Sequence, residues 1–184
     1  MNRLISLHHR LFARVAAQAP DLLPAVARLT FAGVLLTYFW ASAMTKLGDG
    51  ATGLLTPSDG AYAQIFPRAF EALGYDSTQF GVFQQVIVIA GTWAEFLLPL
   101  LIVTGLLTRL AALGMIGFIV VQSLTDIFGH AVDVATVGWW FDKASDAPIL
   151  DQRALWIVLL LILVTMGGGR LSLDALLARR AGTS

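Results

Sequence analysis

The chain has 184 residues, of which 57% are hydrophobic and only 13% are charged. Soluble domains carry about 25% charged residues, and the apolar residues here form long blocks, so the composition predicts an integral membrane protein. Basic and acidic residues balance at 12 each, which favours no nucleic-acid partner, and the absence of cysteine excludes disulfides, thiolate metal sites and covalently attached haem.

Residues 1–18 predict an amphipathic helix that lies on the membrane surface, and the alternative is a frayed tail. Apolar residues recur there at helical spacing, with arginines between them. Arginine and histidine interrupt what would be the apolar core of a signal peptide, so we expect none. The residues that carry the pattern are Leu4, Leu7, Leu11 and Val15 with Arg3, Arg10 and Arg14.

Four longer apolar segments predict transmembrane helices in a single all-α domain over residues 1–184. Pro24 suits the first turn of the first helix. Only Thr108 and Arg109 separate the second helix from the third, which predicts an antiparallel hairpin. The glycines at 167–169 end the fourth helix. The predicted spans are about residues 23–47, 83–107, 110–128 and 152–166.

The polar connections at 49–80 and 129–151 are longer than a helix bundle needs, and residues 61–73 predict a short interfacial helix. Basic residues are more numerous, eight against four, on the side of the two termini. This bias predicts that both termini lie in the cytoplasm. The eight are Arg3, Arg10, Arg14, Arg28, Arg109, Arg170, Arg179 and Arg180, and the four are Lys46, Arg68, Lys143 and Arg153.

Glu95 lies in the middle of the second predicted span. A carboxyl at that depth is costly unless it is neutralised or partnered, so Glu95 is a candidate functional residue. We count no basic residue at its depth, and this predicts a protonated carboxyl at neutral pH. Pro99 has no N–H to bond the carbonyl of Glu95, which predicts a bend in the helix there.

Counting about 1.5 Å per residue along the helices places Tyr38 and Gln122 at the depth of Glu95. The three side chains are therefore candidates to bind a ligand or to carry protons inside the bundle. The alternative is that they only join the helices, because hydrogen bonds between membrane helices contribute about 0.6 kcal/mol each on average.

Lys46 stands at the outer end of the first predicted span and has two interpretations. Its ammonium group reaches the membrane interface, or it binds a ligand at the outer mouth of the bundle, where it faces Asp126. Asp126, His130 and Asp133 also form a loose metal-binding pattern, although one histidine with two carboxylates is a small ligand set.

Three separated motifs resemble the DoxX family. They are FWASAMTKLGD at residues 39–49, WAEFLLPLLIVTGLLTRLAAL at 93–113 and GGGRLSLDALL at 167–177, with Ala43 where the family usually has glycine. The resemblance covers about residues 24–177 and identifies Glu95 as the membrane carboxylate of the family. The long second connection is similar to that of a branch encoded beside small secreted metal-binding peptides and their maturation proteins.

The resemblance implies a four-helix bundle of the inner membrane. Some relatives, of the DoxD type, are quinone-linked subunits of a thiosulfate oxidoreductase, and others associate with superoxide dismutase and sulfurtransferase partners. It also implies that the partners of this chain are the lipid bilayer, other polypeptides of a membrane complex, and further copies of itself.

Three functions are consistent with these features. We rank first an accessory subunit of a multi-protein system for metal or oxidative stress or for peptide maturation and export, because the chain has no self-sufficient catalytic set. The second is a quinone-binding subunit of an oxidoreductase complex, and the third a small transporter. We expect no enzyme in the isolated chain and neither haem nor nucleotide, because it has no haem ligand pair or nucleotide-binding motif.

Overall fold

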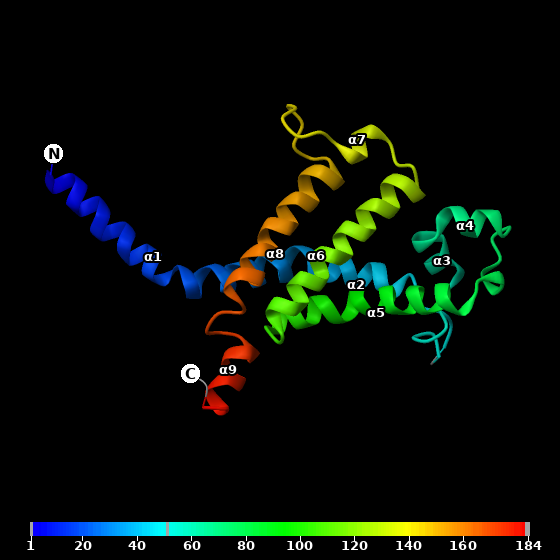
Figure 1. The fold of residues 1–184 in the computed structure, drawn as a ribbon, viewed down its shortest axis with the longest axis horizontal. Coiled ribbons are helices and arrows are strands. Elements are labelled where there is room, and N and C mark those ends of the chain that lie inside the picture. Colours follow the sequence, from blue (N-terminus) through cyan, green and yellow to red (C-terminus); the bar gives the residue numbers. More distant parts are fainter. Residues whose placement is uncertain (1, 51, 183–184) are drawn as a thin grey trace.

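A computed structural model describes residues 2–50 and 52–182, and their regular structure is helical (Figure 1). Within these ranges four segments are long and apolar enough to cross a membrane, which confirms the predicted all-α, four-span protein. We call the end of the bundle that carries the two long connections the loop end, and the opposite end, which carries both chain termini, the termini end. The four segments are Arg3–Met44, Val82–Thr104, Thr108–Gly129 and Pro148–Met166.

The first segment is a continuous helix built from three stretches, α1 (Asn2–Phe31), the π-helical η1 (Ala32–Leu36) and α2 (Thr37–Met44). Residues 2–18 are helical, as predicted, and Met1 lies outside the described residues. The expected helix start at Pro24 is wrong, because Pro24 lies inside α1. A proline removes one helical hydrogen bond and bends a helix without having to end it. The N-terminal part of α1 projects away from the bundle (Figure 1), and its place on the membrane surface stays a prediction.

The second and third segments form the predicted antiparallel hairpin. α5 (Val82–Thr104) ends at Gly105, which has a left-handed backbone, and α6 (Thr108–Leu124) begins after Leu107, which is also left-handed. The π-helical η3 (Thr125–Gly129) then extends α6 to about its predicted end.

The remaining helices complete the bundle and the second connection. The fourth segment begins with η4, earlier than predicted, because a π-helical turn adds to the start of α8. It ends at Gly167 as predicted, and a short C-terminal helix follows. The elements are α7 (Val134–Val137), the π-helical η4 (Pro148–Arg153), α8 (Ala154–Met166) and α9 (Leu173–Arg180).

The first connection folds into α3 (Asp59–Ile65), α4 (Pro67–Ala72) and the 3-10 turn η2 (Ser77–Gln79). The single predicted helix over residues 61–73 is broken at Pro67, because a proline disfavours helical geometry in the residue before it. Stacked aromatic rings of this connection, with Val88 of α5, form a small separate core. α3 therefore lies against the loop-end part of α5, and α4 packs on α3 (Figure 1).

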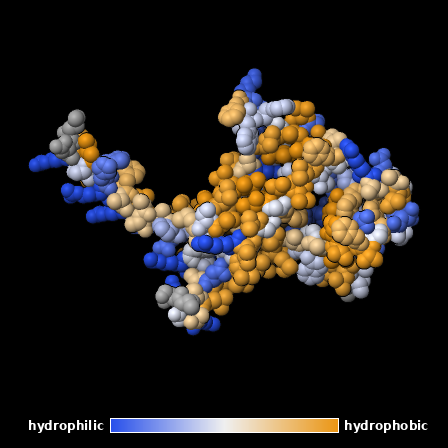
Figure 2. Space-filling view, in the orientation of Figure 1, coloured by the Kyte–Doolittle hydropathy of each residue, from blue (hydrophilic) through white to orange (hydrophobic). Residues whose placement is uncertain are grey.

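The main core fills the termini half of the bundle with large apolar side chains. Phe31, Leu35, Met115, Ile119 and Leu163 are fully buried there, among helices α1, η1, α6 and α8. Apolar residues also dominate the outer flank of the bundle, whereas the projecting arm of α1 carries hydrophilic residues (Figure 2). An apolar exterior of this kind is what a lipid environment requires.

Arg28 joins three parts of the chain at the termini end. Its guanidinium donates to the carbonyls of Ile102 and Val103, at 3.1 and 2.7 Å, and to those of Gly168 and Leu171, at 3.1 and 2.7 Å. The last carbonyls of α5 have no partner within their own helix, so a cation at this helix end is favourable. A side chain at position 105 would lie 2.8 Å from Arg28 Cζ, so the turn requires glycine at this position.

Asp174 binds the start of α6, whereas Arg28 binds the end of α5. Its carboxylate accepts hydrogen bonds from the N–H groups of Leu107 and Thr108, at 2.7 and 2.9 Å, and from Thr108 Oγ1 at 2.7 Å. Burial raises the pKa of Asp174, but these hydrogen bonds and the nearby Arg28 outweigh it and hold the pKa below its usual value. The α5–α6 turn is thus fixed by one cation and one anion.

Candidate functional site

Lys46, in the turn directly after α2, and Glu95 of α5 form a buried ion pair. Lys46 Nζ donates to Glu95 Oε2 at 2.9 Å and to Oε1 at 3.1 Å, and the two residues are only 4% and 3% exposed. Ser42 Oγ donates to Glu95 Oε1 at 3.1 Å and accepts from Lys46 Nζ at 2.7 Å. A buried pair persists when each charge neutralises the other and further hydrogen bonds satisfy both groups.

This pair corrects two predictions. Lys46 does not reach the interface, because it is buried against Glu95, and a basic group does lie at the depth of Glu95. The chain turns back directly after Lys46, where the N–H of Ser58 donates to its carbonyl at 3.0 Å, so that the loop covers the end of α2. The helical spacing of Ser42 and Lys46 was a signal that could have placed both residues on the face toward Glu95.

The structure brings Tyr38 and Gln122 together but not to Glu95. Gln122 Nε2 donates to the Tyr38 hydroxyl at 3.3 Å, and the Tyr38 ring packs edge-on against Trp156 of α8. Tyr38 lies one helical turn closer to the termini end than Ser42, which therefore reaches Glu95 instead. The predicted layer of three is in fact a hydrogen-bonded pair and a separate ion pair.

A second ion pair joins η3 to η4. Arg153 Nη2 lies 2.6 Å from Asp126 Oδ2, and Arg153 Nη1 donates to Ser123 Oγ at 3.0 Å. Both charged residues stand on π-helical turns, which are rare and often mark functional positions. Arg153 is buried, and nothing in its position at the start of the fourth predicted span indicated this.

The loose metal pattern does not form a site. His130 Nε2 lies 3.1 Å from the carbonyl of Gln64, Asp133 accepts from the N–H of Thr136 at 2.7 Å, and Asp126 is neutralised by Arg153. Across residues 2–50 and 52–182, no three histidine or acidic side chains are placed to hold a metal ion.

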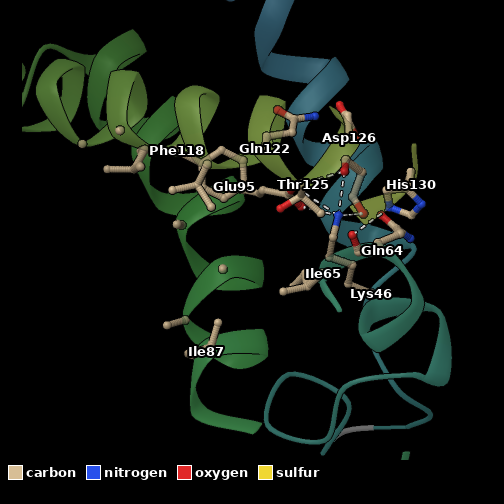
Figure 3. A pocket seen from close by; sticks show the side chains of 18 residues that line it. Lys46, Gln64, Ile65, Ile87, Glu95, Phe118, Gln122, Thr125, Asp126 and His130 are labelled. Atoms are coloured by element: carbon tan, nitrogen blue, oxygen red, sulfur yellow. Dashed lines mark hydrogen bonds and ion pairs between the residues drawn. The ribbon is translucent and has the colours of Figure 1, made fainter. Parts of the chain in front are cut away.

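A cavity of about 470 Å³ lies between α5 and α6 (Figure 3). Ala90, Gly91 and Ala94 line it from α5, and Gly114 and Gly117 line it from α6. Several of these small residues are exposed on the side of the bundle, where a spanning protein faces lipid. The cavity is therefore open to the bilayer between the two helices.

One end of this cavity is polar and the other apolar. Lys46, Glu95 and Gln122 line the polar end, with Asp126 and His130 at its loop-end rim (Figure 3). The side-chain oxygen of Gln122 is buried without a hydrogen-bond partner among the described residues. Apolar side chains of α5 and α6, including those of Leu98, Phe118 and Val121, form the rest of the wall.

Four apolar helices around a buried lysine–glutamate pair define a polytopic α-helical membrane protein. The DoxX family model matches residues 23–128, more than half of the chain, and the chain therefore belongs to the DoxX family. The matched part contains both partners of the ion pair and the residues that line the cavity, except His130. No curated protein and no solved structure matches the chain.

Proposed function

We propose that this DoxX-family protein is a membrane subunit that holds a lipid-soluble ligand with a polar ring, of the quinone class, in the cavity between α5 and α6. The observation that carries the proposal is the position of the Lys46–Glu95 pair at the polar end of a cavity that opens to lipid. Its volume, about 470 Å³, falls in the range of small-molecule sites, about 300–1,000 Å³.

The residues at the polar end suit a ring that carries oxygen atoms. The ammonium group of Lys46 donates a hydrogen bond to Ser42 Oγ at 2.7 Å. It can exchange this hydrogen bond for one to a ligand carbonyl. Glu95 can then hold or release a proton beside that oxygen. The amide of Gln122 offers a further polar contact. The apolar tail of such a ligand would leave between α5 and α6, and a partner subunit would supply or remove its electrons.

A binding measurement tests the proposal. Protein in mild detergent is titrated with a short-chain quinone while tryptophan fluorescence is followed, with Lys143→Met as the control because Lys143 is exposed and outside the cavity. We expect saturable quenching in the wild type and in the control, and none when Lys46→Met is combined with Glu95→Leu. Equal quenching in all three proteins would overturn the proposal.

The accessory role has its own supporting observation. Trp139, Trp140 and Phe141 are 66%, 63% and 102% exposed, beside the acidic residues Asp142 and Asp146 in the second connection. Exposed aromatic clusters are typical of protein interfaces. If replacing the three aromatic residues by serine abolishes the cellular phenotype while Glu95→Gln leaves it intact, the accessory role takes precedence. The proposed location is the inner membrane, with both termini in the cytoplasm.

A further inference from the structure

We propose that the Lys46–Glu95 pair exchanges protons with the aqueous phase at the loop end only. The proposal deepens the proposed function by stating from which side of the membrane its site exchanges protons. It rests on the ion pair and not on the identity of the ligand. It follows from a contrast between the polar groups on the loop side of the pair and the apolar side chains that pack on its termini side.

Polar groups lead from the pair toward the loop end. The carbonyl of Ser42 accepts from Thr45 Oγ1 at 2.7 Å, and Thr45 Oγ1 accepts in turn from Gln64 Nε2 at 3.1 Å. The carbonyl of Gln64 lies 3.1 Å from Nε2 of His130, which is exposed. Gln64 and His130 also line the cavity, so water at its rim can reach the pair along these groups (Figure 3).

On the termini side of the pair, the polar side chains end with the hydrogen-bonded Tyr38 and Gln122, and apolar packing follows. From Phe96 to Val103 every residue of α5 is apolar, and at about 1.5 Å per residue this stretch is about 12 Å long. Ile102 within this stretch packs in one core with Leu35 and Met115, and all three are no more than 2% exposed. The close-packed part of this stretch, beyond Leu98 in the cavity wall, excludes water, and so it blocks proton exchange in that direction.

Apart from the pair itself, two titratable residues of the described chain line the cavity, and both lie on its loop side. Asp126, already paired with Arg153, and His130 stand at the loop-end rim. Asp59 of α3 accepts a hydrogen bond from Ser77 instead. Arg28 of α1, on the termini side, is held by four carbonyls.

The cysteine-free chain allows a direct accessibility test. Single cysteines at Gln64 and Ala94 sample the rim and the wall of the cavity, and Lys143→Cys and Arg180→Cys mark the loop side and the termini side. Each variant is placed in sealed proteoliposomes free of quinone. A membrane-impermeant thiosulfonate is then added on one side only, and in a separate sample on the other side only. We expect the Gln64→Cys and Ala94→Cys proteins to react from the side that labels Lys143→Cys. Reaction of the Ala94→Cys protein from the Arg180→Cys side, or from neither side, would contradict the proposal.

A second measurement follows the proton itself. The infrared carboxyl band that disappears in Glu95→Gln is recorded in proteoliposomes whose inner and outer pH are set separately. We expect this band to respond to the pH on the loop side and to ignore the pH on the termini side. A response to the termini side would overturn the inference while leaving quinone binding untouched. Failure of quinone binding with one-sided titration would reject the proposed ligand and keep the inference.

Discussion

The two ends of the bundle satisfy their charged groups in different ways. At the termini end, Arg28 and Asp174 are bound mainly by backbone carbonyls and N–H groups, and they fix the α5–α6 turn. At the loop end, Lys46 and Glu95 are bound mainly by each other, beside a cavity. A charge satisfied by backbone cannot leave it without loosening a helix end, whereas a charge satisfied by another side chain can be shared with a ligand. The comparison predicts a structural role for the first pair of residues and a binding role for the second.

The largest change in stability should come from removing one partner of the loop-end pair. Glu95→Ala leaves the buried ammonium of Lys46 without its counter-charge, and breaking such a pair costs about 3–5 kcal/mol. Replacing both partners, by Lys46→Met with Glu95→Leu, should restore wild-type stability, because apolar residues of similar size avoid the desolvation of both charges. Unfolding in mixed micelles, followed by circular dichroism, measures both. A double variant as unstable as Glu95→Ala would mean that the pair is structural after all.

Arg28→Met should give the next largest loss, about 3 kcal/mol, because hydrogen bonds from a charged donor contribute about 1.5–3 kcal/mol each and do not add fully. Arg28→Lys should recover little, since one ammonium group cannot reach four carbonyls arranged around a planar guanidinium. Quinone titration of the folded fraction should give the wild-type affinity. A loss of binding without a loss of stability would show that the two ends are coupled.

Asp174→Asn should cost about 1 kcal/mol at neutral pH, as expected for the loss of a charged group at a helix N-terminus. The pKa of Asp174 is lowered in the folded protein, so its contribution is complete above the usual value of about 3.9 and is lost as the pH falls through the folded value. The free energies of unfolding of the wild type and of Asp174→Asn should therefore converge in acid. If the difference between the two free energies of unfolding does not change with pH, the charge of Asp174 is not the source of the stabilisation.

The smallest effect on stability should come from Gly117→Leu. A side chain at this position meets no atom within 4 Å at its Cβ, so the change should alter stability by less than about 0.5 kcal/mol. The leucine fills the opening between α5 and α6, and quinone affinity should fall at least about tenfold, or about 1.4 kcal/mol. Leu155→Ala, on a lipid-facing part of α8, is the matched control and should bind normally. Normal binding by Gly117→Leu would place the ligand outside the cavity.

Most of the fold could be predicted from the sequence, because hydrophobic blocks and glycine stops determine the number and the ends of the spans. The pairing inside the bundle could not. Counting residues from a common end assumes straight, parallel helices, and this assumption grouped Tyr38 with Glu95 while leaving Lys46 at the surface. The turn that folds the chain back over Lys46 depends on contacts with residues near Ser58, which no local pattern indicates. The cavity depends on how far α5 and α6 diverge, and that is a property of the packed bundle.

The π-helical turns η3 and η4 make the loop end sensitive to the length of the chain. Each turn of this kind holds one residue more than an α-helical turn, and each residue rotates a helix by about 100°. Deleting a single residue from η3 would therefore turn Asp126 away from Arg153 without removing any charged group. Insertions and deletions at this end can thus redirect polar side chains, so that related chains could change what they bind while keeping every charged residue. At the termini end, deleting one residue from the α5–α6 turn would only break that turn.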